Sequence, residues 1–140
     1  VMNKKIIIAA AFASALFSQL ANAEIAVIVH PSNANALDEA AISKIYLGRE
    51  KSFADGSSVI PMSLGEAAAA SATFNEKVLK KSSSQLKAYW SKLVFTGKGT
   101  PPKEVASDDE MIKLVAGNPS VMGYVDAAKV DASVKVVFKF

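Results

Sequence analysis

The chain has 140 residues, of which 51% are hydrophobic, and it carries 16 lysine and arginine side chains, 13 acidic ones, one histidine and no cysteine. This length suits a single domain with a buried core. The lack of cysteine excludes disulfides, thiolate metal sites and a cysteine nucleophile. The lone histidine, His30, has no partner at the spacing of a metal site, so we expect no metal and no cofactor.

Residues 1–23 have the pattern of a secretory signal peptide. Lys4 and Lys5 precede an apolar run at residues 6–17, and Ala21-Asn22-Ala23 is a cleavage signal. We expect cleavage before Glu24, export of the protein, and a single domain over residues 24–140. An uncleaved N-terminal anchor is the alternative. No later segment is long and apolar enough to span a bilayer.

Cleavage would also remove two lysines, which leaves 14 basic side chains against 13 acidic ones. The basic composition of the whole chain therefore says little about its partners. A balance so close to neutral predicts no basic stripe, and we expect no nucleic-acid partner.

Apolar runs bounded by turn residues predict four strands, at Ile25–Val29, Val59–Met62, Val121–Val125 and Val134–Phe140. The first run is continuous and β-branched, which is typical of a strand buried on both faces of a parallel sheet. A short turn or helical piece is expected around residues 126–130.

Helix signals lie between these strands. Asn35, Ser63, Ser82 and Ser107 are each placed to cap a helix, and the last three have Glu66, Gln85 and Glu110 at the capping-box position. The expected helices end near Gly48, Leu79, Gly97 and Gly117. Strands that alternate with helices predict an α/β fold, with a mostly parallel central sheet flanked by helices.

The helix that begins at Ser82 carries the densest aromatic cluster and the only tryptophan. Its apolar residues recur at helical spacing and share one face: Leu86, Tyr89, Trp90, Leu93 and Val94. We expect the core of the domain to pack against this helix. An aromatic site that stacks on a ligand is the alternative.

Catalytic patterns are scarce. Asp108, Asp109 and Glu110 are explained by the helix N-terminus that they occupy. The Gly97–Thr100 segment follows a helix, whereas a P-loop follows a strand and opens a helix, so we interpret it as a surface turn. A serine hydrolase would need a base that the sequence does not show. We expect a binding protein and not an enzyme.

In chain order, five segments are similar to a known family: Ile45-Tyr46-Leu47-Gly48-Arg49, Asp55-Gly56, Val59-Ile60-Pro61, Tyr89-Trp90 with Phe95-Thr96-Gly97, and Met122-Gly123-Tyr124-Val125. The chain resembles the small phosphate-transporter substrate-binding-protein-like domains of Gram-negative bacteria, which are similar to one lobe of the two-lobed periplasmic phosphate-binding proteins. The resemblance implies a periplasmic-binding-protein-like single lobe, a periplasmic location, and a role in phosphate or oxyanion uptake with an ABC transporter.

Ligands of open α/β sheets lie beyond the carboxyl ends of strands. We therefore take Ser63, Gly65, Ser71 and Thr73 as candidate ligand-binding residues, with Ser32 and Asn33 as a second wall. Two features weaken this site. The segment lacks the arginine that the resemblance implies, and Glu66 adds a negative charge.

A single lobe also supplies only half of the contacts of a two-lobed binder, so tight binding would need a second copy or an envelope protein. The alternative function is a periplasmic interaction module that is derived from one lobe of a phosphate-binding protein and binds no ligand.

Overall fold

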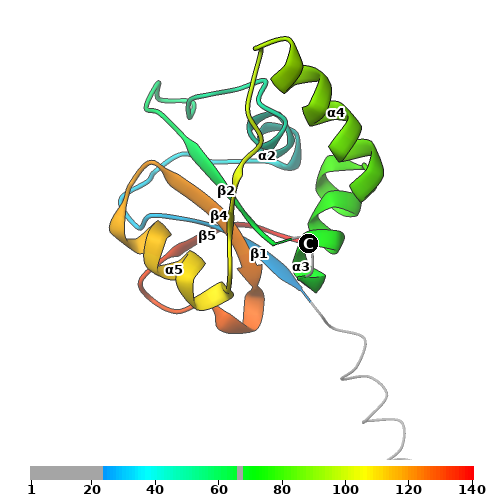
Figure 1. Ribbon diagram of the computed structural model, residues 1–140. Coiled ribbons are helices and arrows are strands. Elements are labelled where there is room, and N and C mark those ends of the chain that lie inside the picture. The colour runs from blue at the N-terminus through cyan, green and yellow to red at the C-terminus, as the bar shows by residue number, and fades with distance from the viewer. Residues whose placement is uncertain (1–23, 66–67) are drawn as a thin grey trace, which may run out of the picture.

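The computed structural model describes residues 24–65 and 68–140, so the predicted signal peptide and Glu66 lie outside the described residues. Figure 1 shows a central sheet with helices packed around it. The strands are β1 (Ile25–Val29), β2 (Ile60–Leu64), β3 (Lys103–Val105), β4 (Val121–Asp126) and β5 (Lys135–Lys139). The helices are α2 (Glu39–Tyr46), α3 (Ala69–Phe74), α4 (Ser83–Phe95), α5 (Asp108–Gly117), a π-helical turn η1 (Asn75–Leu79) and a 3-10 turn η2 (Ala127–Lys129).

The sheet has the strand order β3-β2-β4-β1-β5. β2 pairs in parallel with β3 and with β4, whereas β1 pairs antiparallel with β4 and with β5. Four strands therefore point the same way and β1 runs against them. The predicted α/β class is confirmed, but the sheet is not fully parallel. All five residues of β1 are buried, because both faces of this strand are covered and it has neighbours on both sides.

Neighbouring residues of β4 show how the two faces are covered. Gly123 faces α5 so closely that a Cβ atom there would lie 2.3 Å from the Met111 sulfur. Tyr124 points to the opposite face. There its ring stacks on Phe74 of α3, with centroids 4.2 Å apart, and lies 5.9 Å from Tyr46 of α2. The sheet is thus a middle layer between α5 on one side and α2 with α3 on the other.

Two predicted helix starts are wrong. The first helix is capped by Asp38, whose carboxylate accepts from the Ala41 N–H, and not by Asn35. The Asn35 side chain instead exchanges hydrogen bonds with Asp55 and so joins two loops. Ser63 caps no helix either, because β2 continues through it to Leu64.

The helix expected from Ser63 begins only at Ala69, after an Ala68 cap that makes no side-chain hydrogen bond. It continues as η1 and ends at Leu79, as predicted, because Lys80 adopts a left-handed conformation with φ 57°. The predicted boundaries of β1 are confirmed, and those of β4 and β5 are right to within one residue. Strand β3 was not predicted.

Helix α4 is capped as predicted. The Ser82 hydroxyl accepts from the Gln85 N–H, and the Gln85 side chain accepts from the Ser82 N–H. The expectation that the core packs against α4 holds only in part, because Leu86 and Tyr89 pack against the core but no residue of this helix is buried. Leu86, Tyr89, Trp90 and Leu93 are only half-buried. The core lies instead between the sheet and helices α2, α3 and α5.

Candidate functional site

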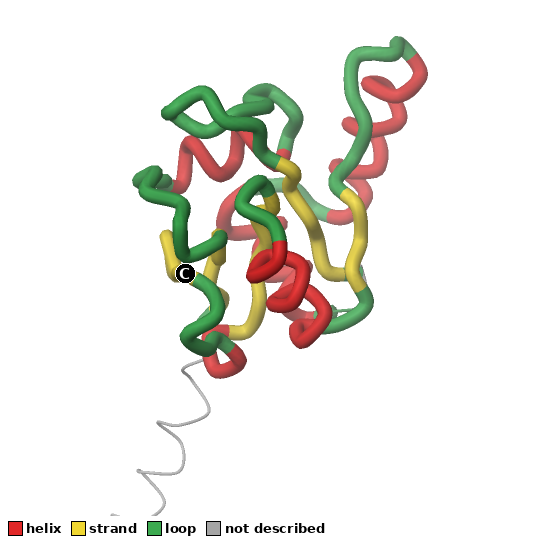
Figure 2. The backbone as a smooth tube through the Cα atoms, turned by 90° about the vertical axis from the view of Figure 1, so that its left-hand side faces the viewer, coloured by secondary structure: helices red, strands yellow, loops and turns green. Residues whose placement is uncertain are grey.

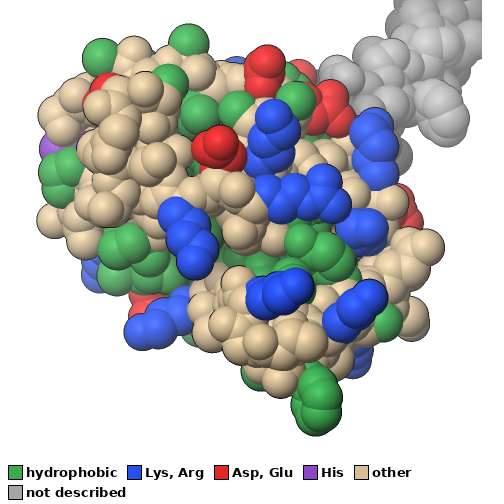
Figure 3. Space-filling view, turned by 90° about the horizontal axis from the view of Figure 1, so that it is seen from above, with side chains coloured by type: hydrophobic (Ala, Val, Ile, Leu, Met, Phe, Trp, Pro, Cys, Tyr) green, Lys and Arg blue, Asp and Glu red, His purple; other side chains and the backbone are tan. Residues whose placement is uncertain are grey.

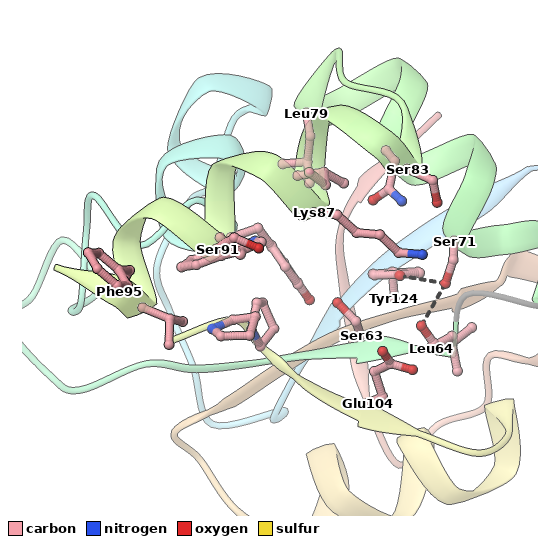
Figure 4. Close-up of a pocket in the computed structure, with 17 residues that line it drawn as sticks. Ser63, Leu64, Ser71, Leu79, Ser83, Lys87, Ser91, Phe95, Glu104 and Tyr124 are labelled. Atoms are coloured by element: carbon pink, nitrogen blue, oxygen red, sulfur yellow. Dashed lines mark hydrogen bonds between the residues drawn. The ribbon is translucent and has the colours of Figure 1, made fainter. Parts of the chain in front are cut away.

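A groove of about 700 Å³ opens between the end of β2, helix α3 and helix α4. Figure 4 looks into this groove, with the side chains from α4 along one wall and those from the sheet along the other. It has two chemically different ends. Hydroxyl, amide and charged side chains gather near the end of β2, and apolar side chains follow the C-terminal half of α4.

Of the six candidate ligand-binding residues predicted from the sequence, Ser63 is the best placed to contact a ligand in the groove. It is the second-last residue of β2. Its side chain is half-buried and lines the groove. Lys87 of α4 faces it from across the groove, and its side chain extends toward Ser71 and Tyr124 (Figure 4). Ser83 and Asn75 line the same end. This end therefore combines a cation with several hydrogen-bonding groups, which is a chemistry that suits a small anion.

Ser71 also lines the groove, but its hydrogen bonds are already made. It is buried, and its hydroxyl donates to the Leu64 carbonyl oxygen at 2.7 Å. A hydroxyl has a single proton, so in the 2.9 Å contact with Tyr124 it is the Tyr124 hydroxyl that donates to Ser71. Neither group keeps a proton for a ligand. Ser71 therefore fastens α3 to the end of β2.

Tyr124 lies at the base of this arrangement. Burial raises the pKa of Tyr124, while its interactions with the side chains of Ser71 and Ser63 act in the opposite direction. Glu104 of β3 lines the groove nearby and also raises this pKa through its charge. An anion at this end would meet the Glu104 carboxylate as well as the Lys87 ammonium. At about 4 Å and an effective dielectric of 20, such a carboxylate would cost roughly 4 kcal/mol.

The other predicted residues do not complete the site. Gly65 follows Ser63 and lies beside Glu104, whose carboxylate oxygen would be 3.6 Å from a Cβ atom at that position. Thr73 does not line the groove, and its hydroxyl donates to the Ala69 carbonyl oxygen within α3.

Ser32 and Asn33 lie at the opposite end of the sheet from Ser63. The expected second wall is therefore wrong, because β1 runs against β2 and their carboxyl ends point in opposite directions. Asn33 is buried in its own loop, where its side chain accepts from Asn35 and its carbonyl oxygen accepts from Lys135.

Sequence reasoning missed Asn75, Ser83, Lys87 and Glu104 as groove residues. Lys87 and Ser83 are one helical turn apart, so the spacing could have placed them on one face of α4. Nothing local could have shown that this face looks toward β2. Glu104 belongs to the strand that was not predicted.

The apolar end of the groove is formed by Trp90, Val94 and Phe95 of α4 together with Pro101 and Pro102. The indole ring of Trp90 also rests on Gly48, where an added Cβ atom would lie 3.1 Å from it. Gly48 has a φ of +75° and lies two residues after the end of α2. The tryptophan thus packs against the glycine that follows α2, and no separate stacking site is needed to explain it.

The tyrosines of the recognised motifs have structural roles too. Tyr46 donates to the Met62 carbonyl oxygen at 2.8 Å, and Tyr89 donates to the Leu47 carbonyl oxygen at 2.6 Å. Tyr46 therefore ties α2 to β2, and Tyr89 ties α4 to the end of α2.

Two features are absent from residues 24–65 and 68–140. No three His, Cys, Asp or Glu side chains come together there to hold a metal ion, and no helix in that part of the chain has the length and hydropathy to cross a membrane.

The fold defined by this sheet and its helices is that of phosphate-binding proteins of ABC transporters. The chain is similar to a protein from Clostridium perfringens described as a phosphate ABC transporter substrate-binding protein and solved with bound phosphate, with a TM-score of 0.63 and 20% identity. It is also similar to an ABC-type phosphate transport receptor from Vibrio cholerae (TM-score 0.64, 18% identity) and to PstS from Borrelia burgdorferi (TM-score 0.63, 12% identity).

Each of these similarities covers 82% of this chain but only 44%, 45% and 46% of the respective protein. The chain thus spans less than half the length of these proteins, as one lobe of a two-lobed binder would. The resemblance in the sequence to this fold is confirmed. A scan against protein-family models and a search of curated proteins found no match.

Proposed function

We propose that this protein is an exported, periplasmic solute-binding-like domain that binds phosphate or a related small oxyanion weakly, at the polar end of the groove. The observation that carries the proposal is the position of Lys87, whose side chain reaches across the groove toward the hydroxyl-lined end of β2 (Figure 4). The similarity in fold to phosphate-binding proteins supports it.

Weak binding follows from the same residues. Ser71 has no proton to donate, and Glu104 brings a negative charge to the groove. One open wall also leaves much of a bound ion in water. Tight binding would need a second copy or an envelope protein to close the groove, and uptake would then depend on an ABC transporter as a partner.

The test is thermal melting of the purified protein with phosphate, and with chloride at the same ionic strength. At a phosphate concentration of 100 times the dissociation constant, binding should stabilise the fold by about 2.7 kcal/mol, a shift of several degrees. Lys87→Ala should abolish the shift, whereas Lys113→Ala on the exposed side of α5 should keep it. No shift with phosphate or sulfate in the unmodified protein would refute oxyanion binding.

Glu104→Gln is the complementary variant. It removes the negative charge from the groove and keeps the size of the side chain, so phosphate should bind more tightly. An unchanged or weaker affinity, measured by calorimetric titration, would show that the anion does not bind beside Glu104.

Export can be tested separately. We expect the protein in the periplasmic fraction, with an N-terminus at Glu24 after removal of residues 1–23. An intact N-terminus in the membrane fraction would instead support the uncleaved anchor.

The apolar end of the groove favours a second candidate, an interaction module that binds no ion. Val94 is 52% exposed, and it lines the groove with Trp90 and the two prolines, on a wall that residues 24–65 and 68–140 leave open. If phosphate has no effect on melting and cross-linking in the cell captures one envelope protein through this wall, the interaction module becomes the better explanation.

A further inference from the structure

The charges of this chain are separated along the sequence. Residues 77–103 contain seven lysines and no acidic residue. Within residues 24–140, the remainder has seven basic and thirteen acidic side chains. The near-neutral net charge of residues 24–140 is therefore the sum of +7 on residues 77–103 and −6 on the remaining residues. The expectation of no basic stripe for nucleic acid therefore needs a closer look at where these lysines lie.

This basic segment includes the part of the protein that stands furthest from the core. We call residues 82–102 the α4 arm. In Figure 2, α4 and the loop that returns from it project from the body of the molecule at the upper right. The side chains of Lys87, Lys92 and Lys98 in the arm are all exposed.

The end of the α4 arm is also apolar. Phe95 is 91% exposed and Val94 is 52% exposed, although both are large hydrophobic residues. Ser84, Ala88, Ser91 and Phe95 recur at helical spacing and form an exposed stripe of small residues that ends in the phenylalanine. Figure 3, which looks down on this end of the molecule, shows lysine and arginine side chains gathered around exposed hydrophobic ones.

Three acidic side chains lie close to parts of the arm. Glu39 pairs with Lys80, at 3.5 Å, below the arm. Glu104 lines the groove, and Glu50 lines a separate hollow together with Lys98. Neither Lys92 nor Phe95 borders that hollow.

We propose that the α4 arm binds peripherally to the surface of an anionic phospholipid bilayer, with Phe95 inserted among the headgroups and Lys92 and Lys98 against the lipid phosphates. An exposed aromatic residue beside lysines on a short helix is the combination that interfacial membrane segments use. Each lysine near an anionic surface strengthens binding about fivefold. A purely polar acidic protein surface would explain the lysines but would leave the exposed Phe95 without a partner. The proposal does not depend on phosphate binding or on export.

The experiment is co-sedimentation of the purified protein with vesicles of phosphatidylcholine alone, and of phosphatidylcholine mixed with phosphatidylglycerol. The single tryptophan, Trp90, lies in the arm, so a blue shift of its emission gives a second readout. We expect binding to the anionic vesicles alone, and weaker binding as salt is raised. Binding to neither kind of vesicle would refute the proposal.

Matched variants locate the contact. The double variant Lys92→Glu with Lys98→Glu should weaken binding at least tenfold, whereas Lys113→Glu with Lys129→Glu makes the same change of charge outside the arm and should have a small effect. Equal losses in the two variants would mean that net charge alone drives binding, and would overturn the proposal.

The variant Phe95→Ser distinguishes binding to a membrane from binding to other polyanions. The residue is almost fully exposed, so the variant should fold normally and still lose most of its vesicle binding. Vesicle binding that is insensitive to this substitution would overturn the proposal. Soluble poly-glutamate or DNA that binds with the same affinity as the anionic vesicles would also overturn it, in favour of a general polyanion surface.

Discussion

Two aromatic clusters in this protein have opposite environments. Tyr46, Phe74 and Tyr124 come from three separate elements and are all buried, with ring centroids 4.2 to 5.9 Å apart. Tyr89 and Trp90 are neighbours on α4, with centroids 5.2 Å apart, and are only half-buried. Aromatic residues that are dense along one helix do not mark the core. The core forms where aromatic residues from different elements converge.

The largest contrast should come from removing one ring of the buried cluster and one exposed ring of α4 outside both clusters. Phe74→Ala leaves a cavity between Tyr46 and Tyr124 and should lower the free energy of unfolding by about 3–5 kcal/mol. Phe95→Ala removes a ring that is 91% exposed and should change it by less than about 0.5 kcal/mol. Urea denaturation would measure both. Similar losses would mean that the arm belongs to the core.

Gly48→Ala tests how the outer cluster is held. The substitution places a side chain at a φ of +75° and 3.1 Å from the Trp90 ring. The left-handed conformation alone should cost about 1–2 kcal/mol. Gly117→Ala is the control, because nothing lies within 4 Å of a Cβ atom there. Trp90 fluorescence should change in the first variant and stay constant in the second.

Tyr46→Phe tests the polar part of the inner cluster. It removes the hydrogen bond to the Met62 carbonyl oxygen and leaves that acceptor without its tyrosine partner, so we expect a loss of about 1–2 kcal/mol. Urea denaturation of the variant would measure this loss. A neutral result would show that the hydroxyl contributes nothing beyond the ring.

The smallest effect is a dependence of stability on pH. Burial raises the pKa of Tyr46 well above its ordinary value of 10.0, and that of Tyr124 is raised too. In the unfolded chain both hydroxyls lose their protons near pH 10, whereas in the folded protein they keep them. Stability should therefore be complete below about pH 10 and fall as the pH rises further. Thermal midpoints should fall less steeply in Tyr46→Phe, and parallel curves would contradict this assignment.

The sequence signals that held were local ones. Ser82 with Gln85 predicted a cap that involves only four residues, and the β-branched run at Ile25–Val29 predicted a strand with both faces covered. The direction of that strand could not be predicted, because a central antiparallel strand between two helical layers is just as hydrophobic as a parallel one. Direction is decided by how the chain connects distant elements.

The same limit applied to the candidate site. Ser63 and Glu66 have the spacing of a helix start, yet pairing with β3 draws the end of β2 into the sheet. Lys103-Glu104-Val105 is too short and too polar to predict a strand alone, and it forms one because β2 offers it an edge. Lys87 and Glu104 come to line the same groove only after these long-range pairings form.

The position of β1 between β4 and β5 also sets an order of events for the chain as it is made. Both partners of β1 come from the last twenty residues of the sequence, and Ile25 exchanges backbone hydrogen bonds with Phe140. A ribosome-bound chain that ends at Gly117 would hold its most apolar strand with neither neighbour in place. Closing a loop of that length makes folding slow. The segment IAVIV therefore has neither of its strand partners until residues 121–139 have been made.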